Sequence, residues 1–192
     1  TENDFSKILK NAGINVTVAP VFEYECDVTN PSLDGFDVVI LLDGNTPDNE
    51  MPASGQTALV NFVNSGGGLI MTEWITNENS KGSYANMSDL LLYDPVQFNY
   101  AEGSETFTVI KDHPITMGLP SSFSVPNHAG NAGGVKPDAT VLISGSVLPN
   151  ALAVKQYGEG RIVQYAVAGN SVGTPFISSV DMQQLLINSV NW

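Results

Sequence analysis

One continuous apolar run constrains the fold of this chain more than any other feature. The stretch "GFDVVILLDGN" (residues 35–45) has five consecutive apolar residues between Asp37 and Asp43 and is bounded by Gly35 and Gly44. Such a run is typical of a parallel strand that is buried on both faces. The next segments, "MPASGQTALVNFVNSGGG" and "LIMTEW", have the patterns of a helix that ends at Gly66 and of a second short strand.

This alternation of strand and helix predicts a parallel sheet with helices on both faces. Further strands are expected at "INVTVAP", "ETFTVIKD", "TVLISG", "ALAVKQYGEG" and "GRIVQYAVAGN", and "YGEG" should turn a hairpin between the last two. Residues 113–139 are rich in Gly, Pro, Ser and Asn, so we expect a long loop region there, with one short strand at "FSV". The fold class that follows is α/β, with an antiparallel hairpin near the C-terminus.

The charge balance limits the partners of the chain. It has 20 acidic residues against 7 basic ones, a net charge of -13, so it cannot neutralise many phosphates. Neither nucleic acid nor a membrane is expected as a partner, since the apolar runs are also too short to span a bilayer. Cys26 is the single cysteine, which excludes a disulfide within the chain and a cysteine zinc site.

Three segments together resemble a known family. They are "GFDVVILLDGN…ALVNFVNSGGGLIMTEW", "DHPITMGLP" and "YGEGRIVQYAVAGN…PFISSVDMQQLLINSVNW". Their order and content resemble the ThuA-like (trehalose-utilisation) branch of the class I glutamine amidotransferase-like superfamily. The resemblance implies a flavodoxin-like three-layer α/β/α sandwich with a mostly parallel sheet, in a single domain over residues 1–192.

The resemblance does not carry an amidotransferase activity with it. In those enzymes the strand after the glycines leads into a sharp elbow that holds a nucleophilic cysteine, whereas this chain has Thr72, Glu73 and Trp74 there, and no G-x-C-x-G or G-x-S-x-G motif. ThuA-like relatives usually carry a histidine near the elbow, an acidic pair after "HPIT-GLP" and a Gly-His near the last strand. Here these places hold Glu73, the pair Asn127–His128, and Asn170 after Gly169.

The chain also opens with a helix pattern, where this kind of fold opens with a strand. We therefore expect a domain excised from a larger bacterial protein. Together with the acidic composition, this favours an extracellular or periplasmic location and neighbouring domains of the same protein as partners.

The candidate binding site lies where the predicted strands end, because open α/β sheets bind ligands at the carboxyl ends of their strands. The residues expected there are Asp43, Gly44, Asn45, Glu73, Trp74, His128 and Asn170. Trp74 could stack on the ring of a ligand, and Glu73 with His128 could act as a catalytic acid and base. Each also has a plain structural reading as a cap, a core residue or an exposed loop residue.

No cofactor is expected, and calcium is the one metal that the sequence brings into question. "DGNTPDNE" places several oxygen side chains close together, of which Asp43, Asp48 and Glu50 are the weak candidates for ligands. Pro47 and the misplaced glycine exclude an EF-hand loop.

Three functions remain open. The first is a non-catalytic ThuA-like module that binds a small polar ligand, such as a carbohydrate. The second is a hydrolase or sugar-modifying enzyme that uses Glu73 and His128. The third is a purely structural domain. The missing nucleophile favours the first.

Overall fold

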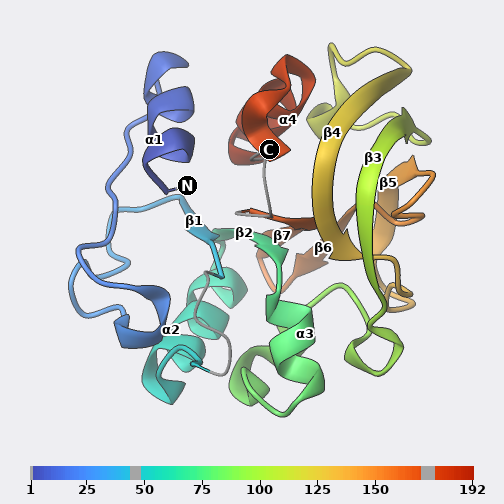
Figure 1. Cartoon of the computed structure of the whole chain (residues 1–192). Helices are drawn as coiled ribbons and strands as arrows, with labels where there is room; N and C mark the ends of the chain where they lie inside the picture. Colours follow the sequence, from blue (N-terminus) through green and yellow to red (C-terminus); the bar gives the residue numbers. More distant parts are fainter. Residues whose placement is uncertain (1, 44–48, 170–175) are drawn as a thin grey trace.

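The structure is a computed structural model and describes residues 2–43, 49–169 and 176–192 (Figure 1). The α-helices are α1 (Glu2–Asn11), α2 (Ala53–Asn64), α3 (Ile75–Ser80) and α4 (Val180–Asn191). The strands are β1 (Val38–Leu41), β2 (Gly68–Glu73), β3 (Tyr100–Val109), β4 (Ser122–Asn131), β5 (Thr140–Gly145), β6 (Leu152–Tyr157) and β7 (Gly160–Ala168). Short 3-10 helices lie at Glu23–Glu25, Ala85–Leu90, Pro95–Gln97, Pro114–Thr116 and Phe176–Ser178.

The strands form one sheet in which part of the sheet closes on itself. The order is β1-β2-β7-β4-β3-β5-β6, and β6 also pairs with β7. Five strands, β7, β4, β3, β5 and β6, therefore make a closed antiparallel barrel. The parallel pairs β1–β2 and β2–β7 extend the sheet from it. β7 is the shared strand, because it is parallel to β2 and antiparallel to β4 and β6.

The barrel closes at one narrow contact between β4 and β7. Gly130 is paired with Val167 there. A Cβ atom on Gly130 would lie 2.0 Å from the carbonyl oxygen of Ala166, so only glycine lets the two backbones approach this closely.

The helices cover the open part of the sheet on two sides. Figure 1 shows α1 and α4 on one side of β1, β2 and β7, and α2 and α3 on the other. In α2 the buried positions Gly55, Gln56, Leu59 and Val63 follow the helical repeat. α2 ends at Asn64, and Gly66 lies in its C-terminal cap as predicted, with a φ of +114° and with its amide donating to the carbonyl of Val63. Among the described residues, no helix is long and apolar enough to cross a membrane.

The predicted fold class is wrong. The sheet is not mostly parallel, and a closed five-stranded antiparallel barrel with additional strands replaces the flavodoxin-like α/β/α sandwich. Two segments account for the difference. "INVTVAP", predicted as a strand, is irregular, and the segment predicted as a loop contains the ten-residue strand β4. β4 is held by its pairing with β3 from Tyr100 to Thr108, a long-range contact that local composition does not encode.

Candidate functional site

The chain makes a strained turn where β2 passes into α3. Trp74 is the residue at the turn, with φ 97° and ψ −32°. A non-glycine residue at positive φ costs on the order of 1–3 kcal/mol, and such strain concentrates at functional sites. The turn has the strand–elbow–helix form that presents a nucleophile in hydrolases of other folds. Here an indole ring takes that position.

The ring of Trp74 stacks on a residue from the barrel. Trp74 and Tyr100 lie with their ring centroids 6.1 Å apart and their planes 10° from parallel. Tyr100 begins β3 and is 50% exposed. Its hydroxyl donates to Glu102. The stack joins the end of β2 to the barrel and leaves an aromatic surface at the edge of the site.

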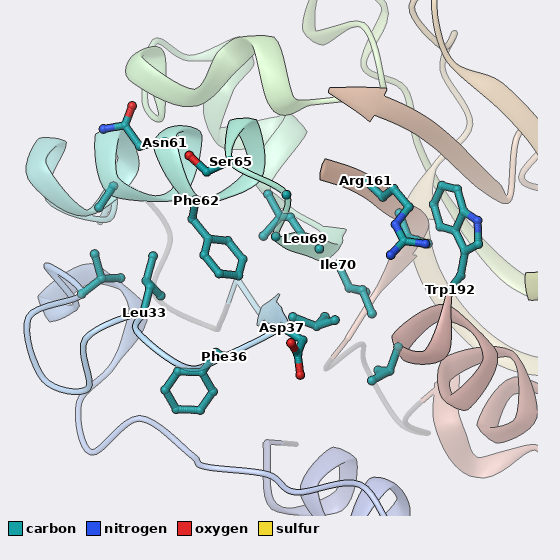
Figure 2. A pocket seen from close by; sticks show the side chains of 18 of the residues that line it. Leu33, Phe36, Asp37, Asn61, Phe62, Ser65, Leu69, Ile70, Arg161 and Trp192 are labelled. Atoms are coloured by element: carbon teal, nitrogen blue, oxygen red, sulfur yellow. The ribbon is translucent and has the colours of Figure 1, made fainter. Parts of the chain in front are cut away.

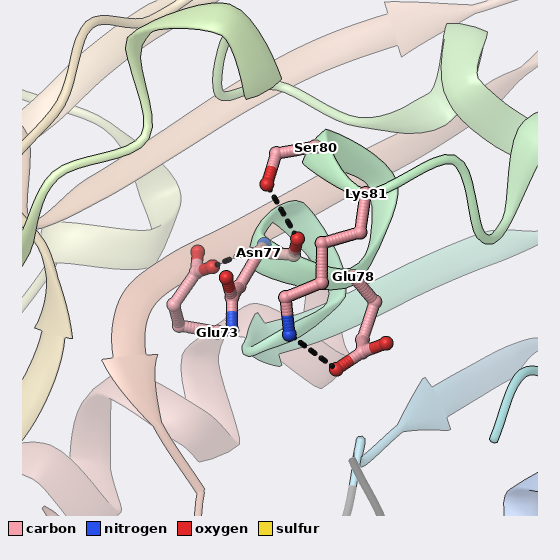
Figure 3. A network of polar contacts seen from close by, with 5 residues as sticks. All are labelled: Glu73, Asn77, Glu78, Ser80 and Lys81. Carbon is pink, nitrogen blue, oxygen red and sulfur yellow. Dashed lines mark hydrogen bonds and ion pairs between the residues drawn. The ribbon is translucent and has the colours of Figure 1, made fainter. Parts of the chain in front are cut away.

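Glu73 lies directly before the elbow and is fully buried. Its Oε1 accepts a hydrogen bond from the amide of Asn77 at 3.3 Å, as Figure 3 shows at the first turn of α3. Its Oε2 has no hydrogen-bond partner among the described residues. Burial, with a small contribution from the charge of Asp43, raises the pKa of Glu73 to about 8 and outweighs hydrogen bonding by Trp74, Thr76 and Asn77, which lowers it. The carboxyl group is therefore mostly protonated at neutral pH.

A buried polar network holds the surroundings of Glu73 in place. Gln164 of β7 donates from Nε2 to Thr76 Oγ1 at 3.0 Å and accepts from the amide of Leu92 at 2.6 Å. The hydroxyl of Tyr93 donates to the carbonyl of Asn150. Burial, and then the charge of Glu73, raises the pKa of Tyr93 well above its ordinary value, so Tyr93 remains a neutral donor.

Asn131 ends β4 on the same edge of the sheet. It is fully buried, and its Oδ1 accepts from the amides of Asn99 at 3.0 Å and Gly133 at 2.8 Å. Because both of these partners are donors, the atom that they contact must be the oxygen of the side-chain amide, and the remaining atom is the nitrogen Nδ2. Nδ2 has no hydrogen-bond partner within the described part of the chain. Asn131 is paired with Tyr100 across β3 and β4, which places it beside the aromatic stack.

Of the other predicted site residues on this edge, the structure describes Asp43. It follows β1 and is 4% exposed, and its charge acts on both Glu73 and Tyr84. Gly44, Asn45, Asp48 and Asn170 lie outside the described residues. Sequence reasoning missed Tyr100 and Asn131, because neither stands at the end of a predicted parallel strand.

The described residues do not assemble the calcium ligands considered from the sequence. Glu50 is exposed, and its Oε2 accepts from Gln56 Nε2 and from the amide of Tyr84. In residues 2–43, 49–169 and 176–192, no three His, Cys, Asp or Glu side chains are grouped so that they could hold a metal ion.

His128 lies in the barrel and is bound to a different carboxylate. Its Nε2 is 2.7 Å from Glu105 Oε1, and its Nδ1 is 3.1 Å from the carbonyl oxygen of Pro126. Burial raises the pKa of Glu105, but donation by His128 and by the amides of Val147 and Leu148 outweighs it and lowers the pKa overall. Both ring nitrogens of His128 are thus engaged, and the structure does not bring His128 to Glu73.

A cavity of about 980 Å³ lies at the opposite, amino-terminal edge of β1 and β2 (Figure 2). Its lining includes Leu33, Phe36, Phe62, Leu69, Arg161 and Trp192. The guanidinium carbon of Arg161 lies 5.5 Å from the centre of the Trp192 ring, so this cation is held by an aromatic face. None of the predicted site residues lines this cavity.

The fold and the elbow define the class of protein: a seven-stranded sheet that closes in part into an antiparallel barrel, with Trp74 at the strained turn between β2 and α3. The chain matches the ThuA family (trehalose utilisation) over residues 1–192 and belongs to it. The predicted family is thereby confirmed.

Solved structures with the same fold support this assignment. A ThuA-like protein from Parabacteroides merdae has a TM-score of 0.72 and 14% identity, with 98% of this chain and 82% of that chain covered. Two cytoplasmic proteins from Salmonella typhimurium have TM-scores of 0.72 and 0.70 at 15% and 16% identity, covering 99% and 97% of this chain and 86% and 84% of theirs. At these identities the likeness concerns the fold alone. No curated protein matched the sequence.

The expected extracellular or periplasmic location is contradicted by these comparisons, because two of the matched structures are named as cytoplasmic proteins. The expectation had rested on acidity and on the opening helix. An acidic surface raises solubility in any compartment, so it does not distinguish one from another.

Proposed function

We propose that the chain is a non-catalytic ThuA-like module that binds a small neutral carbohydrate at the edge formed by the ends of β2 and β4 and the start of β3. The observation that carries the proposal is the strained Trp74, which occupies the elbow and stacks on Tyr100. An indole has no nucleophilic oxygen or sulfur, but its face packs well against the C–H face of a sugar ring.

The family description supports the choice of ligand, since the family is named for trehalose utilisation. The polar groups around the stack support it as well. Glu73 and Asn131 each keep one buried polar atom without a partner among the described residues. Sugar hydroxyls both donate and accept hydrogen bonds, so they could pair with such atoms. We extend the cytoplasmic location of the two Salmonella proteins to this chain as part of the proposal.

The acid–base alternative finds less support. It needs His128 within hydrogen-bond or one-water reach of the substrate and of Glu73. His128 is instead fully buried, with both nitrogens directed at Glu105 and Pro126.

Tryptophan fluorescence tests the proposal, because the chain has 2 tryptophans. In Trp192→Phe only Trp74 remains, and titration with trehalose or glucose should change its emission in a saturable way. In the matched variant Trp74→Phe only Trp192 remains, and no saturable change is expected. A saturable change in Trp74→Phe, in which only Trp192 emits, would place the ligand away from Trp74. No change in wild type with either sugar would refute a trehalose or glucose site.

A further inference from the structure

The edge beside Trp74 holds two buried polar atoms that make no hydrogen bond within the described residues. They are Glu73 Oε2 and Asn131 Nδ2, and both side chains are fully buried. Leaving a buried polar group unpaired costs free energy, so such atoms in a native protein call for a partner. The two atoms come from different strands, which argues against a single local distortion as their common origin.

The strand pairings bring these two residues to one edge. Glu73 is paired with Ala168 across β2 and β7, and Gly130, which precedes Asn131, is paired with Val167 across β4 and β7. Glu73 and Asn131 thus flank the last residues of β7 from the two neighbouring strands. The stack of Trp74 on Tyr100 spans the same gap, since Trp74 follows Glu73 and Tyr100 is paired with Asn131.

Both unpaired atoms act as donors. Oε1 of Glu73 already accepts from Asn77, so the proton of a neutral carboxyl group belongs on Oε2. Oδ1 of Asn131 already accepts from two amides, which leaves its NH₂ group free to donate. The partner of such a pair must offer acceptor oxygens.

We propose that Glu73 and Asn131 recognise the ligand of this site by donating two hydrogen bonds to its hydroxyl or carbonyl oxygens, and that Glu73 must be protonated to do so. The proposal rests on the proposed function and names the residues that select its ligand. A neutral ligand is favoured because the carboxylate of Asp43, which already acts on Glu73, would oppose an anion. A cationic group such as an ammonium has no acceptor atom for the two donors.

The ionisable groups around Glu73 are few in the described structure. Asp43 follows β1, and Tyr93 lies in the buried network beneath the site. Glu78 on α3 is 3.5 Å from Lys81, so its charge is paired (Figure 3). The raised pKa of Glu73, about 8, then sets the pH above which the donor is lost.

The first measurement needs no ligand. Wild type labelled with carbon-13 at the glutamate carboxyl groups is compared with identically labelled Glu73→Gln by infrared difference spectroscopy at about pH 6.5. A protonated carboxyl band that disappears in Glu73→Gln and titrates near the pKa of about 8 is expected. An ionised Glu73 at this pH would overturn the inference and leave the proposed function standing.

The second measurement is the affinity for trehalose and for glucose at about pH 6.5 and about pH 9.5, on either side of the pKa of Glu73. Wild type should bind at least about tenfold more weakly at the higher pH, the effect of losing one hydrogen bond. Glu73→Gln keeps a donor in the same place and should bind equally at both values. Unchanged binding by wild type across this range would overturn the inference.

Asn131→Asp keeps the acceptor for Asn99 and Gly133 and removes the donor, so about tenfold weaker binding is expected at the lower pH. If this variant does not fold, the pH titration of wild type still decides. A protonated Glu73 without sugar binding at either pH would refute the proposed function, and ligand recognition by this pair with it.

Discussion

His128 and Glu105 form a hydrogen-bonded pair inside the barrel, with 2.7 Å between Nε2 and Oε1 and no exposed surface on either side chain. The carboxylate also accepts from the amides of Val147 at 2.7 Å and Leu148 at 3.1 Å through Oε2. The pair therefore ties β3, β4 and the connection after β5 together. Its role, as we read it, is to hold the barrel closed.

Removing one partner of this pair should destabilise the protein strongly. Glu105→Gln keeps the shape of the side chain but removes the carboxylate that accepts from His128 and from the amides of Val147 and Leu148. Because these donors are buried, we expect a loss of about 3 kcal/mol in the free energy of unfolding, measured with urea. Ser124→Ala, an exposed position on β4, is the control and should change stability by less than about 0.5 kcal/mol. If Glu105→Gln changed the free energy of unfolding as little as Ser124→Ala does, the pair would not hold the barrel together.

The closure of the barrel should be sensitive to one glycine. Gly130→Ala places a Cβ atom 2.0 Å from the carbonyl oxygen of Ala166, so the backbones of β4 and β7 must separate. Overpacking of this kind costs about 1–3 kcal/mol, and we expect the upper end because a backbone atom must move. Hydrogen exchange should show faster exchange in β4 and β7 than in β1. If Gly130→Ala had the same exchange rates as wild type in β4 and β7, the close contact between these two strands would be contradicted.

Glu73 should make stability depend on pH. Its pKa in the folded protein is about 8, above the ordinary 4.5, so the folded state holds a proton that the unfolded state releases. The stabilising contribution is complete below the unfolded pKa and is lost as the pH rises through about 8. The melting temperature of wild type should fall across this window more steeply than that of Glu73→Gln. Parallel curves for the two proteins would contradict a raised pKa.

Trp74→Gly should separate binding from stability. Glycine adopts a φ of 97° without strain, which offsets part of the lost contact between Trp74 and Tyr100. We expect the free energy of unfolding to change by less than about 1 kcal/mol while sugar binding is lost. Calorimetric titration with trehalose measures the second effect. Loss of folding together with binding would instead assign Trp74 a structural role.

Much of the local structure could be predicted from the sequence. The apolar run of residues 38–42 marked the strand β1, although β1 is a half-buried edge strand and is not buried on both faces as predicted. Gly66 marked the C-terminal cap of α2, and "YGEG" marked the hairpin between β6 and β7. These features depend on neighbouring residues, on the ability of glycine to adopt positive φ without strain and on the pattern of apolar residues along one element. The family resemblance rested on the same segments and is confirmed.

The tertiary structure alone decided how the strands are paired and which side chains meet. The ten residues of β4 have the composition of a loop, and only pairing with β3 makes them a strand. That pairing lets the end of β4 meet β7 and close the barrel, places His128 beside Glu105 and not Glu73, and brings Tyr100 and Asn131 together near the elbow. Such contacts join residues far apart in the chain, and their free energy comes from burial and hydrogen bonds that exist only once the sheet has formed.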